Sequence, residues 1–308
     1  MHAAVLTSFD APPTYGEYPA PVEGQQEGLV VGVLAAGLHH LTRSRANGSH
    51  YSTKSVLPLV PGMDGVVRDG AGQLRYAVLD DAKLGTFAER TVIDPRRSFV
   101  LPEGIDPVQI AAAMNPGMSS WIALRRRIGF EKGQRVLILG ATSNAGRMAV
   151  QIAKLLGASQ VIAAGRDIAR MDALQGLGAD ETITFDQVDR AGDVDVVLDY
   201  VWGEPAGNAM IPLLTARTDR KSPLTWVHIG SLGGLTAPVP GAALRSSQLQ
   251  IVGSGIGSVP ARDILAELPD LALAVAEGSI QVRARAIPLA QIGEMWDAPA
   301  QERLVFVP

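Results

Sequence analysis

One short segment, VLILGATSNAGRMAVQIAKLL (136–156), has residue types and spacing that suit phosphate binding. Gly140 ends an apolar run of β-forming residues, and Gly146 opens a segment in which apolar residues such as Met148 and Ile152 recur every four positions. A turn between such a strand and such a helix directs free backbone N–H groups and the positive helix end at one point, where a pyrophosphate binds. The segment therefore predicts a dinucleotide-binding turn.

This turn departs from the usual glycine-rich pattern. Of the strict G-x-G-x-x-G arrangement only Gly140 and Gly146 remain, and any strand–helix turn can hold a glycine at each end. Ser143 and Asn144 stand between them, and both residue types tolerate tight turns and carry short side chains that can donate to phosphate oxygens. We therefore expect Ser143 and Asn144 to take over the role of the missing glycines.

The next apolar run ends in AAGRD (163–167), which bears on the choice of cofactor. A ribose with a free 2′-hydroxyl calls for a carboxylate about 20 residues beyond the turn, whereas a 2′-phosphate calls for a small residue and an arginine. Gly165 and Arg166 supply the second combination, and Arg170 follows one helical turn later. We predict NADPH rather than NADH. The alternative is that Arg166 and Arg170 are two solvated arginines at the start of a helix without a phosphate to bind, and the nearby Asp167 favours this interpretation.

The elements that must position these residues form two kinds of pattern. Up to about residue 97, short strands are broken by Pro and Gly, which indicates a small barrel-like β domain. Beyond residues 102–118, helices alternate with nearly continuous apolar runs, as in a buried parallel sheet of βαβ units. The expected strands there are 135–139, 160–164, 194–199, 226–229 and 249–255.

Composition narrows the function classes. The chain has 308 residues, of which 47% are hydrophobic and 19% charged, with a net charge of −4. This is an ordinary globular composition without the basic excess that holds nucleic acid. No apolar run is long enough to span a membrane and no signal peptide precedes the first strand, so we expect a cytoplasmic protein with neither nucleic-acid nor membrane partners. The absence of cysteine excludes disulfides, thiolate nucleophiles and Cys-ligated zinc.

Several motifs together resemble the medium-chain dehydrogenase/reductase superfamily, and within it the zinc-independent quinone oxidoreductase-like branch. They occur in the family's order: LVPGMDGVV (59–67), GTFAERTVI (85–93), AAAMNPGMSSWIAL (111–124), KGQRVLILGATSNAGRMAVQIAKLLGA (132–158), LGAD (177–180), VDVVLDYVWG (194–203) and RLVFV (303–307).

The resemblance implies an α/β fold made of two domains. A GroES-like β-rich catalytic domain would comprise residues 1–117, a Rossmann domain with a doubly wound parallel sheet would bind NADPH with residues 118–254, and residues 255–308 would return to the catalytic domain. It also implies a homodimer formed through the edge of the Rossmann sheet.

The resemblance further implies cofactor-binding residues. Ser143, Asn144 and Ala145 would face the pyrophosphate, and Gly165, Arg166 and Arg170 the 2′-phosphate. The positions that would border the rest of the cofactor are Asn115, at the nicotinamide ribose, together with Tyr200, Ile229, Gly230, Ser231 and Ser254.

The chain also departs from the zinc-dependent members of the superfamily. Where they place a zinc-ligating Cys and His, this chain reads GLHHLTRS (37–44) and PGMDG (61–65), and Met63 cannot serve as that ligand. The four-cysteine lobe for a structural metal is missing as well. We therefore expect no metal site. His39 and Thr42 replace the Asn-x-x-Asp of quinone reductases, so the polar lining of the pocket differs from theirs.

Without a metal, the chemistry favours a conjugated acceptor. A C=C bond conjugated to a carbonyl accepts hydride because the negative charge moves onto the carbonyl oxygen, where hydrogen bonds suffice to stabilise it. In a plain ketone the charge cannot be delocalised in this way, so its reduction generally needs a metal or a strong acid. We predict reduction of quinones or α,β-unsaturated carbonyls. His39 and Tyr51 are the candidate proton donors, with a solvated polar loop as the alternative for His39; His228, on an apolar strand, is expected in the core.

Two alternative functions stay open. One is a carbonyl or enoyl reductase, or an alcohol dehydrogenase-like enzyme, acting on a bulkier biosynthetic intermediate. The other is a non-catalytic NADPH-binding sensor protein.

Overall fold

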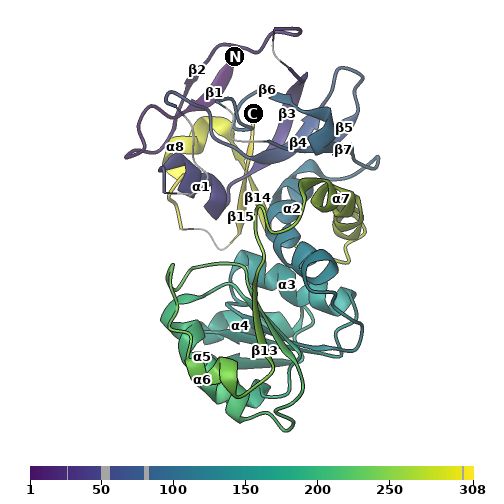
Figure 1. The fold of residues 1–308 in the computed structure, drawn as a ribbon. Helices are drawn as coiled ribbons and strands as arrows, with labels where there is room; N and C mark the ends of the chain where they lie inside the picture. Colours follow the sequence, from purple (N-terminus) through teal and green to yellow (C-terminus); the bar gives the residue numbers. More distant parts are fainter. Residues whose placement is uncertain (26, 50–55, 80–82, 300–301) are drawn as a thin grey trace. The chain divides into compact units, whose positions relative to one another are not determined.

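The structure is a computed structural model that describes all residues except 26, 50–55, 80–82 and 300–301. The chain divides into two compact units (Figure 1). Unit 1 comprises Met1–Asn115, Leu268–Gly278 and Val282–Pro308, and unit 2 comprises Pro116–Glu267 and Ser279–Gln281. The first division lies within a helix at 115/116, two residues before the expected boundary at 117/118. The second division lies at 267/268, whereas the expected boundary was at 254/255.

Unit 1 is built around a seven-stranded sheet with the order β14-β15-β3-β4-β5-β7, in which β6 also pairs with β3, and a separate pair β1-β2. The strands are β1 (His2–Val5), β2 (Thr14–Glu17), β3 (Leu29–Gly37), β4 (Asp64–Arg68), β5 (Leu74–Val78), β6 (Arg90–Ile93), β7 (Ser98–Val100), β14 (Ala284–Pro288) and β15 (Arg303–Val307). Its short helices are α1 (His40–Ala46), α8 (Ile292–Met295), η1 (Pro95–Arg97) and η4 (Leu289–Gln291).

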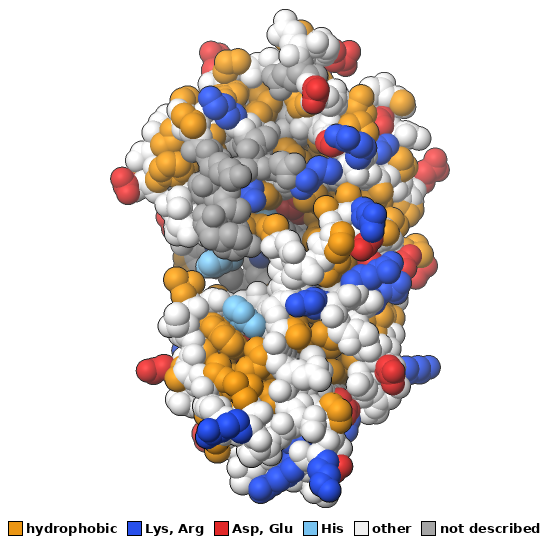
Figure 2. All heavy atoms as spheres, in the orientation of Figure 1, with side chains coloured by type: hydrophobic (Ala, Val, Ile, Leu, Met, Phe, Trp, Pro, Cys, Tyr) orange, Lys and Arg blue, Asp and Glu red, His pale blue; other side chains and the backbone are white. Residues whose placement is uncertain are grey.

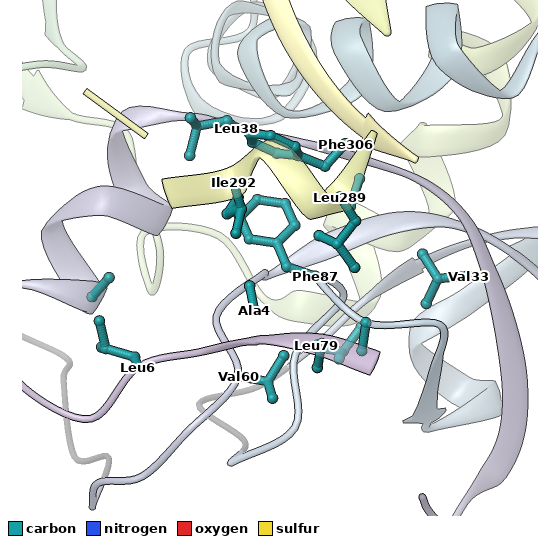
Figure 3. Packing of buried hydrophobic residues seen from close by; sticks show 14 of the residues in the cluster. Ala4, Leu6, Val33, Leu38, Val60, Leu79, Phe87, Leu289, Ile292 and Phe306 are labelled. Atoms are coloured by element: carbon teal, nitrogen blue, oxygen red, sulfur yellow. The ribbon is translucent and has the colours of Figure 1, made fainter. Parts of the chain in front are cut away.

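The core of unit 1 joins the two ends of the chain. Phe87 and Phe306 meet edge to face with ring centroids 5.4 Å apart, and Ile292 and Leu289 pack around them (Figure 3). Phe306 lies on β15, which pairs antiparallel with the end of β3. Residues more than 200 positions apart therefore share one apolar interior, and burying them is the main force that folds unit 1.

Unit 2 has a six-stranded parallel sheet with the order β10-β9-β8-β11-β12-β13. Its strands are β8 (Arg135–Leu139), β9 (Gln160–Gly165), β10 (Glu181–Thr184), β11 (Val196–Asp199), β12 (Leu224–His228) and β13 (Leu249–Gly253). Its helices are α3 (Asn144–Leu155), α4 (Ile168–Gln175), α5 (Gly203–Thr215), α6 (Gly241–Arg245) and the short η3 (Phe185–Ala191). The division between the units falls within α2 (Pro107–Ile122), which continues as the π-helix η2 (Ala123–Arg127), and within α7 (Ala261–Ala276).

The predicted fold class is confirmed. β8 has the expected bounds, and the other expected strands are found within a few residues; β10 was not predicted, because its sequence ETIT is short and only partly apolar. The strand order reverses between β8 and β11, so the carboxyl edge of the sheet has a crevice there that commonly receives ligands.

The charged side chains on the surface are mixed in sign. On the face shown in Figure 2, basic and acidic side chains are interspersed rather than gathered by sign. In the described part of the chain, no helix combines the length and apolarity needed to cross a membrane.

Candidate cofactor and proton-transfer sites

A pocket of about 650 Å³ lies at the carboxyl edge of the parallel sheet in unit 2. It is lined by the turns that follow β8, β9, β10 and β11, and by the loop after β12. The lining residues are Gly140, Thr142, Ser143, Gly165, Arg166, Arg170, Thr184, Phe185, Asp186, Val201, Pro205, Leu232 and Gly233. Four of the predicted cofactor residues, namely Ser143, Gly165, Arg166 and Arg170, therefore line one pocket.

The turn after β8 presents free donors at this pocket. Ser143 is the N-cap of α3: its Oγ accepts from the Gly146 N–H at 3.0 Å and donates to the Gly140 carbonyl at 2.8 Å. A Cβ on Gly146 would collide with that same carbonyl oxygen, so only glycine fits. The N–H groups of Asn144 and Ala145 have no partner among the described residues. The first turn of α3 is thus open to an anion, while the Ser143 hydroxyl is engaged locally.

Arg166 and Arg170 differ in their surroundings. The Nε of Arg170 lies 3.0 Å from the Asp167 carboxylate, which also caps α4 by accepting from the Arg170 N–H. Arg166 is exposed, lines the same pocket and makes no side-chain bond to any described residue. A Cβ on Gly165 would approach Thr142 Cγ2 to 2.9 Å. A small residue and a free guanidinium at this point fit a ribose 2′-phosphate.

The remaining cofactor candidates of unit 2 lie at the carboxyl ends of β11, β12 and β13. The N–H groups of Ile229 and Gly230 both donate to the Asp199 carbonyl, and the Ser254 N–H donates to the His228 carbonyl. Ser231 follows in the same loop. None of these residues lines the 650 Å³ pocket, although Val201, Leu232 and Gly233 in the neighbouring loops do. Asn115 ends the first segment of unit 1 and lies half-buried on α2.

The side chain of Tyr200 points into the protein rather than to solvent. It is 4% exposed, and its hydroxyl lies 3.1 Å from Ser119 Oγ on α2. Burial raises the pKa of Tyr200 to about 12, and the bond to Ser119 acts in the opposite direction. The phenol therefore stays neutral at ordinary pH and can only donate or accept a hydrogen bond.

Asp199 and Trp202 form an unusual connection between β11 and α5. Trp202, beside Tyr200, was expected near the cofactor, whereas Asp199 was not singled out from the sequence. Asp199 Oδ1 accepts from the N–H groups of Val201 and Trp202 at 2.8 and 2.9 Å, and its Oδ2 accepts from Trp226 Nε1 at 2.9 Å. Burial raises the pKa of Asp199, and these bonds oppose the shift. Trp202 has φ 52° and ψ −158°, and it is the one non-glycine residue with positive φ in the described chain. The sequence signal that could have pointed to this connection is Asp199 itself, a carboxylate at the end of an otherwise apolar strand.

The Trp202 ring stacks on His228, with centroids 4.3 Å apart and an interplanar angle of 24°. His228 is the last residue of β12 and is half-buried, so it does not lie in the core as expected from its apolar strand. An apolar strand pattern predicts which face of the sheet a side chain lies on, but it does not predict whether the last residue of the strand is buried by other elements.

His39 belongs to a buried polar cluster in unit 1. Its Nε2 lies 2.5 Å from Asp64 Oδ1 and its Nδ1 lies 3.1 Å from Thr42 Oγ1, so both ring nitrogens are engaged. Asp64 also accepts from the Tyr76 hydroxyl, and burial and the nearby Asp64 carboxylate raise the pKa of Tyr76. At 3% exposure His39 is not a free donor. Tyr51, the other catalytic candidate, lies outside the described residues.

Arg303, at the start of β15, completes this cluster. Burial lowers its pKa to about 10, and the charge of Asp64 works against that shift. Asp64, Tyr76 and Arg303 were not singled out from the sequence, because their proximity depends on the pairing of β4 with β5 and of β15 with β3. Among the described residues, no group of three or more His, Asp or Glu could hold a metal ion.

Comparison with known proteins gives the following. The chain is 31% identical to the probable NADPH-dependent quinone reductase tdiC of Emericella nidulans, and the alignment covers 100% of both chains. It is 27% identical to the chloroplastic NADPH-dependent alkenal/one oxidoreductase of Arabidopsis thaliana, over 58% of this chain and 51% of the relative. No protein-family model matches.

A solved structure shares the whole architecture. The quinone oxidoreductase from Thermus thermophilus, also determined in complex with NADPH, covers 100% of each chain with a TM-score of 0.79 and 24% identity. At this identity the likeness establishes the fold.

Proposed function

Since the chain belongs to the quinone oxidoreductases of the medium-chain dehydrogenase/reductase superfamily, we propose that it reduces quinones or α,β-unsaturated carbonyls with NADPH and without a metal. The observation that carries the proposal is the pocket at the carboxyl edge of the parallel sheet. There the first turn of α3 and the Arg166 side chain lie together, and neither the Asn144 and Ala145 N–H groups of that turn nor the Arg166 guanidinium has a partner among the residues that the structure describes. The whole-length relative in Emericella nidulans supports the same reaction.

The residues of unit 2 fit the cofactor in two places. The N–H groups of Asn144 and Ala145 would donate to the pyrophosphate, and Arg166, beside the small Gly165, would bind the 2′-phosphate, with Arg170 as a second cation. When bound, NADPH supplies the hydride. The protein's part is to hold the dinucleotide across the switch point between β8 and β11 and to bring a proton to the acceptor.

Metal-free reduction suits a conjugated acceptor, because the charge that hydride brings spreads onto oxygen. For His39 the geometry allows a relay rather than direct donation: a proton can pass between Thr42 Oγ1 and Asp64 through the two ring nitrogens. Tyr51 stays a prediction.

The proposal is tested by following the loss of nicotinamide absorbance with three acceptors: 1,4-naphthoquinone, 2-cyclohexen-1-one and cyclohexanone. We expect turnover with the first two, little with the saturated ketone, and a clear preference for NADPH over NADH. Elemental analysis of the active protein should find no stoichiometric zinc. Tight NADPH binding without oxidation of any acceptor would favour the non-catalytic sensor, and turnover only with large biosynthetic enones would favour the alternative reductase.

We also propose a homodimer formed through β13, since β13 ends the six-stranded sheet and would otherwise leave backbone donors and acceptors unpaired. Sedimentation equilibrium should give twice the chain mass. Ile251→Pro should weaken association, because the alternation set by the Ser254 N–H, which donates to the His228 carbonyl of β12, turns the Ile251 N–H toward the open edge. The cytoplasmic location expected from the sequence stays a prediction.

A further inference from the structure

His228 ends β12 in the half of the sheet edge formed by β11, β12 and β13, and it does not itself line the 650 Å³ pocket. The sheet consists of two halves, β8-β9-β10 and β11-β12-β13, and in a doubly wound fold each half receives one nucleotide of a dinucleotide. The first half carries the anion-binding turn and Arg166, the features that suit the phosphorylated adenosine. The second half, in which His228 ends β12, would then receive the nicotinamide, the part of the cofactor that supplies hydride.

The imidazole is held from two sides but keeps one nitrogen open. Trp202, from the β11–α5 connection, covers one ring face, and Ser231 Oγ, from the loop after β12, lies 3.2 Å from Nε2. Nδ1 has no hydrogen-bond partner among the described residues. The Asp199 carboxyl, at the end of β11, interacts electrostatically with this histidine. The ring is thus oriented, half-buried and able to bond to one further atom.

The stacking partner sits in a strained backbone. The φ and ψ angles of Trp202 fall in a region that glycine enters freely and other residues enter only at a cost. Two bonds from Asp199 Oδ1, to the N–H groups of Val201 and Trp202, hold the chain there. Strain of this kind persists where the residue has a task, and the task visible in the structure is contact with His228.

We infer that His228 is the catalytic acid of the reduction, with Nδ1 as the donating atom and Trp202 as its positioning residue; this rests on the proposed function. In an enone, hydride forms a C–H bond at the β carbon, the C=C π pair moves, and the negative charge settles on the carbonyl oxygen. The Nδ1–H bond then breaks, an O–H bond forms, and the neutral imidazole recovers a proton from water. One hydride and one proton enter the acceptor, and the enol tautomerises to the saturated ketone.

His39 is less suited to this step. Both of its ring nitrogens are engaged, with Asp64 and Thr42, and only 3% of the residue is exposed. His228 has the open nitrogen that direct donation requires.

The test compares acceptors whose oxyanions differ in basicity. His228→Gln keeps an amide that can bond to Ser231 but cannot act as an acid. With 2-cyclohexen-1-one, whose enolate is strongly basic, we expect kcat to fall about 10²–10⁴-fold. With 1,4-naphthoquinone, whose reduced anion is a weak base that forms without needing a proton, the fall should be much smaller.

Two measurements separate this inference from the function on which it rests. The affinity for NADPH, from nicotinamide fluorescence without any acceptor, should be unchanged within about twofold in His228→Gln and in the control His2→Gln, a surface histidine of unit 1. Wild-type protein that fails to bind NADPH would remove the proposed function itself. A binding-competent His228→Gln with wild-type enone turnover would overturn the role of His228 alone. Should this variant not bind NADPH, His228→Asn takes its place in the same comparison.

Discussion

Arg166 and Arg170 lie in the same pocket, but they differ in their ion pairing. Arg170 is paired with Asp167, whereas Arg166 has no described partner. A charge-assisted bond to a phosphate is worth roughly 1.5–3 kcal/mol, which corresponds to about 10–100-fold in affinity. We therefore predict that Arg166→Ala raises the Kd for NADPH by that factor and leaves the Kd for NADH nearly unchanged, as measured by fluorescence titration.

Arg170→Ala is the matched control for this prediction. Because Asp167 already neutralises its guanidinium, its removal should change the NADPH affinity by only a few-fold. Equal losses for both coenzymes in Arg166→Ala would contradict the assignment of the 2′-phosphate to Arg166.

Prediction from the sequence works best at the residue scale where the signal is local. The turn from Gly140 to Gly146 and the Gly165–Arg166 pair are each encoded within a few residues, so their positions in one pocket could be expected. His39 was singled out from the sequence as a proton-donor candidate, but its pairing with Asp64 joins residues 25 positions apart and depends on strand pairing. The exposure of His228 depends on Trp202, whose backbone conformation no propensity indicates.

At the scale of elements, the β11–α5 connection stores strain at Trp202. Trp202→Ala and Trp202→Gly both remove the indole and the contacts it makes with the unit 2 core, but only glycine relieves the backbone. The strain is of order 1–3 kcal/mol, and glycine loses roughly 0.5–1 kcal/mol in chain entropy. We predict that Trp202→Gly is more stable than Trp202→Ala by about 1 kcal/mol in urea unfolding. An alanine variant as stable as the glycine variant would show that the connection is unstrained.

The cluster on β4, β5 and β15 leads to a second prediction at this scale. Asp64 is 2% exposed, bonds to His39 and Tyr76, and its charge acts on the buried Arg303. Asp64→Asn keeps the shape but leaves the Arg303 cation uncompensated in a buried site, which typically costs about 3–5 kcal/mol. Thermal unfolding should therefore begin roughly 10 °C lower.

Asp10→Asn, at an exposed position, is the control for the loss of a carboxylate and should leave the thermal unfolding temperature unchanged. An Asp64→Asn variant with wild-type stability would mean that Arg303 is compensated elsewhere.

For the molecule as a whole, the parallel sheet of unit 2 followed from its apolar runs, since strands buried on both faces must be apolar throughout. The β-rich unit was harder to predict, because its sheet combines β3 and β4 with β14 and β15 from the other end of the chain. Only the resemblance to a family indicated that residues 255–308 return there. The divisions between the units lie inside α2 and α7, and no composition change marks a position within a continuous helix.

Buried tyrosines set the alkaline limit of stability. The pKa of Tyr200 is raised from 10.0 to about 12 in the folded protein, so the unfolded chain releases this proton first as pH increases. The stabilising contribution is therefore complete below the unfolded pKa and is lost as pH rises toward the folded pKa. A difference of about two units corresponds to roughly 2–3 kcal/mol.

The Tyr200→Phe side chain cannot ionise, so between pH 10 and 12 this variant should lose roughly 2–3 kcal/mol less stability than the wild type. At neutral pH it lacks the hydrogen bond to Ser119. Circular dichroism melts over this pH range measure the difference, and Tyr15→Phe, at a position 41% exposed, should follow the wild-type curve. The pKa of the buried Tyr76 in unit 1 is raised as well, so a shallower loss of stability should remain in Tyr200→Phe and disappear only when both phenols are removed. Parallel curves for the wild type and Tyr200→Phe would mean that the phenol is reached by solvent before the unit unfolds.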